Sequence, residues 1–131
     1  MLQKNITFAV MNQAFTIEIS SDSADWRLYN IRIMCELQDD SGLRTGFAST
    51  TCKADAQPAR LTTLPCRRLR IFVYVIPESL PADRTIKNHP DFDAVLLVRC
   101  GNRTIARESI EVNRWGGASI ERMYDSQGEM K

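Results

Sequence analysis

His89 lies in the segment Asn88-His-Pro-Asp-Phe-Asp93, beside two carboxylates, and it is the one histidine of the chain. A histidine beside acidic residues can act as a general base or help to hold a metal ion. No nucleophile motif accompanies it, and the sequence gives no positive support to a Ser/His/Asp set whose members lie far apart in the chain. His-Pro-Asp is also common turn chemistry, in which the aspartate bonds its own backbone. The sequence therefore favours a turn here and a protein that is not an enzyme.

Acidic residues in predicted loops are a second candidate for chemistry, because carboxylates from converging loops can hold Ca²⁺ through about six to eight oxygens. The Asp91-x-Asp93 spacing is similar to that of calcium-binding β-sandwiches of the C2 type, and the other ligand loops of that family do not match. We therefore keep Asp91 and Asp93 as candidate metal ligands and assign no family. The acidic loop residues are Asp22, Asp25, Asp39, Asp40, Asp83, Asp91 and Asp93.

A tryptophan beside an arginine precedes two glycines near the end of the chain, at Arg114-Trp-Gly-Gly117. Trp and Arg on an exposed turn are typical of a partner-binding hot spot. The alternative, which the sequence favours, is that Trp115 folds back and caps one open end of the fold. Trp26, at the start of a predicted strand, has the same two interpretations. The candidate partner- or ligand-binding residues are Trp115, Arg114, His89 and Trp26.

Charge argues against nucleic acid as a partner. Seventeen Lys and Arg residues against sixteen Asp and Glu leave a formal net charge of +1, which does not steer the protein to polyanions. The densest basic run, Cys66-Arg-Arg-Leu-Arg70, would be divided between the two faces of a strand and has no interleaved aromatic residues. We expect no nucleic-acid binding.

The cysteines and the N-terminus indicate an intracellular protein. Cys35, Cys52, Cys66 and Cys100 include no CxxC pair, and no histidine stands at ligand spacing, so structural zinc is not expected. The chain shows no secretory signal and no apolar run of the ~20 residues that span a membrane. We therefore expect a cytoplasmic protein with free thiols, although Cys52 and Cys66 flank a loop and their pairing stays open.

The stretch Leu69–Ile76 (LRIFVYVI) is apolar on both alternating faces. This pattern predicts a central strand covered on both sides. Ala94–Val98 is also apolar throughout, and we expect it to lie near this strand. Nothing on either strand is chemically reactive, so function is expected from loops and edges.

Period-two alternation predicts strands along most of the remaining chain. Three hairpins are expected: Ile6–Val10 with Phe15–Ile19, Leu28–Gln38 with Leu43–Thr51 around the turn Asp39–Gly42, and Ala94–Val98 with Thr104–Val112 around Gly101-Asn102, which places Val98 opposite Ile105. Arg60–Leu64 is expected as a short edge strand, Ala118–Tyr124 as the last strand, and Lys53–Ala59 as the place for a helical turn.

Eight or nine short strands and no convincing helix predict an all-β, antiparallel two-sheet β-sandwich with Greek-key or C2/Ig-like topology, and a closed β-barrel is the alternative. We expect one domain over residues 1–124 and a flexible tail over 125–131. Unpaired strand edges favour a non-enzymatic assembly or adaptor subunit that contacts a protein partner or a second copy of itself. The alternative is a domain whose end loops bind Ca²⁺, a lipid headgroup or a carbohydrate.

Overall fold

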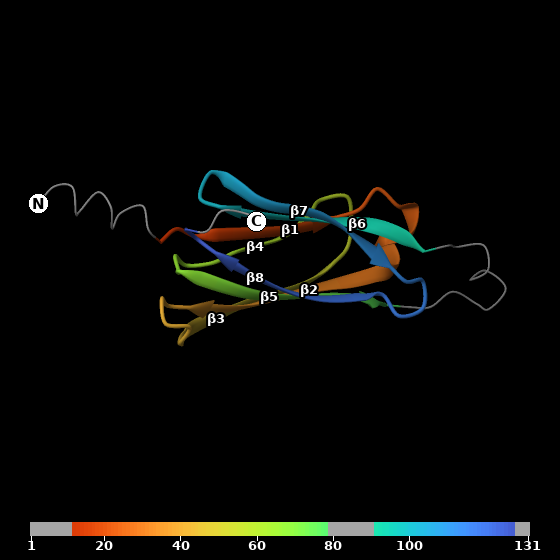
Figure 1. Cartoon of the computed structure of the whole chain (residues 1–131). Coiled ribbons are helices and arrows are strands. Elements are labelled where there is room, and N and C mark those ends of the chain that lie inside the picture. The colour runs from red at the N-terminus through yellow and green to blue at the C-terminus, as the bar shows by residue number, and fades with distance from the viewer. Residues whose placement is uncertain (1–11, 79–90, 128–131) are drawn as a thin grey trace, which may run out of the picture.

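The computed structural model describes residues 12–78 and 91–127, and this part of the chain is an antiparallel β-sandwich (Figure 1). Two four-stranded sheets pack face to face and do not close into a barrel, so the predicted fold class is confirmed and the barrel alternative is wrong. The strands are β1 (Phe15–Ser20), β2 (Tyr29–Gln38), β3 (Arg44–Lys53), β4 (Ala59–Thr62), β5 (Arg68–Pro77), β6 (Phe92–Cys100), β7 (Arg103–Val112) and β8 (Ala118–Asp125), and a short 3-10 helix η1 spans Ala24–Leu28.

The strand orders are β4-β1-β6-β7 in one sheet and β3-β2-β5-β8 in the other. The predicted strand Leu69–Ile76 is β5, and it lies inside its sheet between β2 and β8. The predicted strand Ala94–Val98 is part of β6, which lies in the opposite sheet rather than beside β5. Among the described residues, no helix is long and apolar enough to cross a membrane.

The core lies between the two sheets and is built from alternate residues of the inner strands. Burial of each such side chain contributes about 1.5–3 kcal/mol relative to leaving it exposed. Period-two alternation identified these positions correctly, because a strand with one buried face places every second residue inside. Fully buried members include Phe15, Ile17, Ile19, Ile31, Ile33, Leu69, Ile71, Leu96 and Val98.

The prediction that β5 is covered on both sides is wrong. Its inner residues, such as Ile71 and Val73, are buried. On the outer face Phe72 and Tyr74 are only half-buried, and Ile76 is 42% exposed. No layer of the described chain covers this face, so the strand is apolar on a side that meets solvent.

The predicted hairpin between Ile6–Val10 and Phe15–Ile19 is also wrong. β1 pairs with β4 along one edge and with β6 along the other, so that Ile17 lies opposite both Leu61 and Val98. A strand has only two edges, and both are therefore occupied within the described residues. Ile6–Val10 itself lies outside these residues.

The other hairpins follow the predicted turns. β2 and β3 pair around Asp39–Gly42, and Gly42 has the positive φ of 88° that the reversal needs. β6 and β7 pair around Gly101-Asn102, but a bulge between Val98 and Arg99 places Val98 opposite Ala106 instead of Ile105. A bulge inserts one extra residue, and two-residue turn rules do not reveal it.

Two smaller expectations differ from the structure. Residues 54–58, where a helical turn was expected, form no helix, and the 3-10 helix instead covers Ala24–Leu28 after Ser23, whose hydroxyl accepts a hydrogen bond from the Asp25 amide. The predicted tail begins too early. β8 runs to Asp125, and buried Ser126 donates its amide to the Arg67 carbonyl at 2.7 Å. Residues 128–131 lie outside the described residues.

Candidate functional site

Arg114 lies in the turn after β7 and contacts several other segments at one end of the sandwich. Its side chain is 3% exposed and forms an ion pair with Asp25 of η1. Its amide donates to Asp91 Oδ1 at 2.8 Å, and its carbonyl accepts from the Tyr29 hydroxyl at 3.2 Å. A buried charge held in this way stabilises the loop arrangement, and it is not accessible to a partner.

The two tryptophans have opposite roles. Trp26 is 2% exposed and its ring lies edge-on to Phe92 at 6.3 Å, and Phe92 in turn contacts Tyr29 at 5.6 Å. Trp26 therefore caps this end of the core. Trp115 is 52% exposed and does not fold back, so the capping interpretation is wrong for Trp115 and fits Trp26.

The turn that carries Trp115 is held by side-chain hydrogen bonds and requires a glycine. The Asn113 side-chain oxygen accepts hydrogen bonds from the amides of Trp115 and Gly116, each at 2.9 Å. Gly117 has a φ of 75°, and a Cβ at this position would lie 1.8 Å from the Val75 carbonyl oxygen. Only glycine fits this turn without displacing the backbone of β5.

The candidate metal ligands Asp91 and Asp93 do not converge on a cation site. Both Asp91 carboxylate oxygens face hydrogen-bond donors, the Arg114 amide at 2.8 Å and the Asn113 side-chain nitrogen at 3.4 Å. The Asp93 side chain is exposed, while its carbonyl accepts from the Ser21 hydroxyl. The described residues contain no group of three or more His, Cys, Asp or Glu placed to hold a metal. Ca²⁺ therefore has no support from this geometry.

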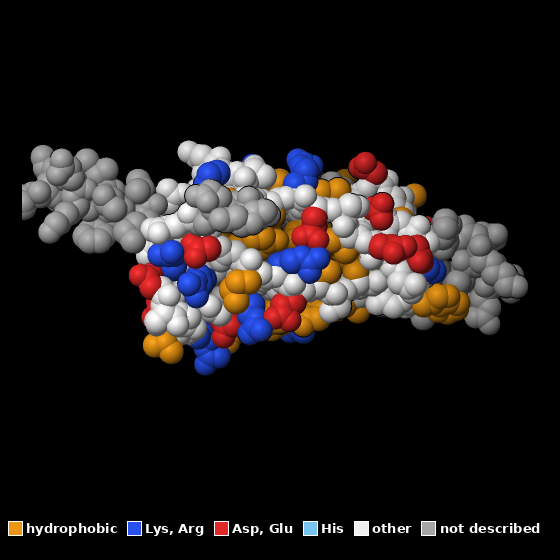
Figure 2. All heavy atoms as spheres, in the orientation of Figure 1, with side chains coloured by type: hydrophobic (Ala, Val, Ile, Leu, Met, Phe, Trp, Pro, Cys, Tyr) orange, Lys and Arg blue, Asp and Glu red, His pale blue; other side chains and the backbone are white. Residues whose placement is uncertain are grey.

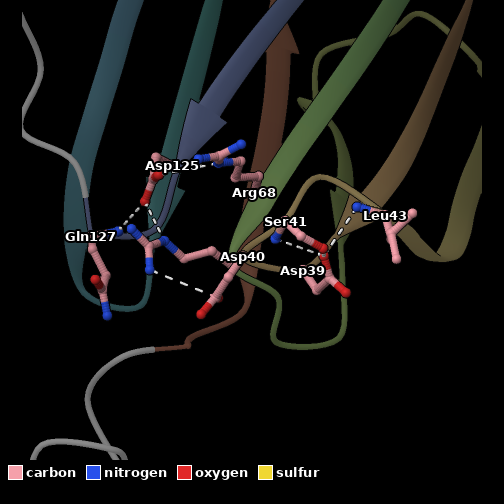
Figure 3. Close-up of polar contacts among 8 residues, drawn as sticks. Asp39, Asp40, Ser41, Leu43, Arg68, Asp125 and Gln127 are labelled. Carbon is pink, nitrogen blue, oxygen red and sulfur yellow. Dashed lines mark hydrogen bonds and ion pairs between the residues drawn. The ribbon is translucent and has the colours of Figure 1, made fainter.

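Of the remaining acidic candidates, Asp39 and Asp40 have local partners. Asp39 accepts from the amides of Ser41 and Leu43 and from the Ser41 hydroxyl (Figure 3). The Ser41 side-chain bond and then the Leu43 amide lower the pKa of Asp39. Asp22 lines the hollows described below, Asp40 lies 3.8 Å from Arg67, and Asp83, like His89, lies outside the described residues.

The basic run Cys66–Arg70, at the start of β5, does not form an anion-binding patch, because its charges are neutralised. Arg67 donates to Asp125 Oδ1 at 2.9 Å, and Arg68 lies 3.5 Å from Oδ2 of the same residue (Figure 3). Arg70 pairs with Glu121 at 2.7 Å. Burial raises the pKa of Asp125, and hydrogen bonds from the Gln127 amide and Arg67 outweigh it, so that its pKa is lowered.

Two open hollows flank the Ser20–Ser23 loop, with volumes of about 380 and 450 Å³. Trp26 and Asp55 line the first, and Phe92 and Asp93 line the second. Ligand sites normally enclose most of a small molecule among apolar walls with a few convergent polar groups. These hollows are open and partly polar, so they give little support to a ligand-binding function of the end loops.

Three of the four thiols are buried, and Cys52 is half-buried. All four cysteines are free, so Cys52 and Cys66 do not pair. Burial raises the pKa of Cys35 to about 12 and that of Cys66 to about 11. A thiolate is the nucleophilic form, so these residues are not suited to covalent catalysis.

The feature that sequence reasoning missed is an apolar band on the outer face of the sheet β3-β2-β5-β8. Its members are cross-strand or diagonal neighbours. Met34 of β2 lies directly opposite Phe72 of β5. Met123 of β8 lies opposite Arg70 of β5 and is therefore diagonal to Phe72. Phe47 is 66% exposed and Met123 52% exposed. The band comprises Phe47, Met34, Phe72, Tyr74, Ile76 and Met123. The signal for it was the apolar outer face of Leu69–Ile76.

Arg70, which lies between Phe72 and Met123 of the band, is neutralised by two glutamates. Arg70 pairs with Glu121 at 2.7 Å and lies 3.7 Å from Glu36, and its guanidinium lies 5.6 Å from the centre of the Phe72 ring. Figure 2 shows oppositely charged side chains beside one another in the middle of its view and acidic side chains gathered toward its right end. The band is defined by its exposed apolar side chains, such as Phe47 and Met123.

Comparison with known proteins supports the architecture. No known family model matches the chain, and no curated protein matches its sequence. A crystal structure of a DUF4425 family protein from Bacteroides ovatus is similar, with a TM-score of 0.50 and 12% sequence identity, and the match covers 89% of this chain and 98% of that chain. The likeness shows the fold alone. The fold is a β-sandwich.

Proposed function

We propose that this protein is a non-enzymatic β-sandwich that binds a partner protein through the outer face of the sheet β3-β2-β5-β8. The observation that carries the proposal is the apolar band on this face. Surface apolar residues scattered singly are normal, whereas a contiguous group on one face is typical of an interaction site.

The composition of the band suits a protein partner. The Arg44 guanidinium lies 4.6 Å from the centre of the Phe47 ring, so the two side chains support one another at an exposed position. Aromatic, methionine and arginine side chains are enriched in protein interfaces, while lysine, glutamate and aspartate are depleted. The pairing of Arg70 with two glutamates reduces the cost of burying that charge under a partner.

The opposite face supplies a contrast. Glu18, on the outer face of β1, is 11% exposed at its side chain and is held by Arg60 at 2.7 Å and Arg99 at 3.1 Å. Thr16 and Thr62 pair beside it at 3.3 Å. The polar side chains of this face bind one another, whereas side chains of the apolar band, such as Phe47 and Met123, are exposed to solvent.

A two-step binding experiment tests the proposal. The full chain is immobilised, captured proteins are identified from the source cells, and the Kd of each is then measured with the purified pair. The double variant Phe47→Ser with Met123→Ser should weaken binding at least about tenfold, which corresponds to about 1.4 kcal/mol.

Leu64→Ser is the matched control, because Leu64 is 76% exposed and is not part of the band. It should leave Kd unchanged. A partner that binds the double variant and the parent chain equally well would refute the proposal, as would a chain that stays monomeric and captures nothing specific.

A further inference from the structure

The four terminal strands of the described sheets are not equally protected. β4 has four residues, and short edges pair poorly. β7 carries charges along its length and the bulge beside Ile105, and β8 carries Glu121, Arg122 and Asp125. Arg122 also spans to Glu108 of β7 with bonds of 3.0 and 2.7 Å. Each of these three strands has a device that discourages pairing with another chain.

β3 has no such device. It is ten residues long, and its charges are confined to its two ends, Arg44 and Lys53. The residues Thr45–Cys52 between them carry neither charge nor proline. From Gly46 to Lys53 the pairing with β2 is regular, so every second residue of β3 directs its amide and carbonyl away from the sheet.

We propose that the edge of β3 binds an extended segment of a partner protein, rich in acidic residues, as an additional strand of the sheet. This inference rests on the proposed function and specifies how the partner is held. Backbone hydrogen bonds along a sheet edge supply affinity, and alternate side chains of the added strand supply specificity.

Both faces of β3 leave room for such a strand. On the outer face, Phe47 is an exposed anchor at the margin of the apolar band. On the inner face stand small, half-buried residues, among them Ala48, Thr50 and Cys52. An added strand would cover these positions and extend the core toward β4.

Charge selects an acidic segment over a second copy of this chain. Arg44 and Arg32 are exposed and form no ion pair within the described residues. Arg32 lies beside Thr51 of β3. Two copies of β3 paired antiparallel over their whole length would place Arg44 of each opposite Lys53 of the other, with no acid on either strand. Like charges directly opposite destabilise a strand pair.

The probe is an acetylated and amidated heptapeptide of alternating valine and threonine with aspartate at both ends, compared with the same peptide bearing lysine at both ends. Each is titrated into the ¹⁵N-labelled full chain. The acidic peptide should shift the amide resonances of β3 and slow hydrogen exchange at alternate β3 amides, with a Kd of about 1 mM. The basic peptide should bind at least about fivefold more weakly.

Charge-reversal variants test the selectivity. Arg32→Glu with Arg44→Glu should invert the preference between the two peptides. Arg107→Glu is the matched control, because Arg107 is also exposed and lies on the opposite edge, in β7; it should leave the preference unchanged. No saturable shift up to about 5 mM acidic peptide, or shifts confined to other strands, would overturn the inference.

Backbone variants separate this inference from the proposed function. In an antiparallel pair adjacent residues point their amides in opposite directions, so one of Ser49→Pro and Thr50→Pro removes an amide that does not bond β2. Thermal melting identifies that variant, which should lose peptide binding while retaining the fold. If both variants unfold, the charge-reversal pair decides alone. A partner that is lost in the Phe47→Ser, Met123→Ser chain but retained by the folded proline variant would leave the proposed function standing and refute strand addition.

Discussion

Polar side chains in the loops accept hydrogen bonds from nearby backbone amides. Asp39, Asp91 and Asn113 each accept hydrogen bonds from main-chain amides at 2.8–3.0 Å. An unpaired buried or half-buried amide is costly, and short polar side chains satisfy it locally. Asp91, which the sequence offered as a calcium ligand, is therefore used to hold a turn, whereas the Asp93 side chain is exposed.

Gly117 provides a residue-scale prediction. Gly117→Ala should destabilise the fold by at least about 2 kcal/mol, because φ is unfavourable for an L-residue and the new methyl meets the Val75 carbonyl at 1.8 Å. Gly116→Ala is the control, since the nearest atom to its added Cβ is the Asn113 side-chain oxygen at 3.7 Å. Its effect should stay within about 0.5 kcal/mol. Urea unfolding measures both, and equal losses would contradict the assigned role of the turn.

At the scale of elements, alternation was sufficient to find the strands and most turns. It identified β2, β3 and the inner face of β5 because burial on one side imposes a period of two. It could not show which apolar outer face has a covering layer, and β5 was misinterpreted for this reason. Nor could it reveal the bulge beside Ile105 or the two partners of β1, β4 and β6, because pairing between distant strands leaves no local signal.

Hydrogen exchange provides a prediction at the element scale. β5 is paired on both sides by β2 and β8, and Leu69, Ile71, Val73 and Val75 are at most 1% exposed. β3 pairs only with β2 and buries no side chain fully. Amides of β5 should therefore exchange only through global unfolding, and those of β3 with a free energy at least about 2 kcal/mol lower. β7 is the control: it is also a terminal strand, but its Ile105, Ile110 and Val112 are buried, unlike any side chain of β3. Protection of β3 equal to that of β5 would contradict an open edge.

The whole molecule is held by a core between the sheets together with polar links at their margins. Arg122 of β8 reaches Glu108 of β7, Arg67 binds Asp125 at the end of β8, and Arg103 binds the carbonyl of Ser126, the next residue. These links join the two sheets or fix the end of the last strand. Because most are partly exposed, each contributes about 1 kcal/mol or less, and the apolar core supplies most of the stability.

Cysteine reactivity reports on this packing as a whole, because Cys35 comes from one sheet, Cys100 from the other and Cys66 from the connection between them. All three are buried, whereas Cys52 is half-buried. Burial, and next the charge of Asp55, raises the pKa of Cys52, so its reaction with a thiol reagent should be slow at pH 7 and faster at pH 9. We expect one thiol to react in the native chain and all four in urea, with the three buried thiols modified at the rate of global opening. Cys52→Ser should abolish the native reaction and leave the three slow ones unchanged. A thiol that reacts in that variant faster than the rate of global opening would show that the two sheets open separately and that the core does not unfold as one unit.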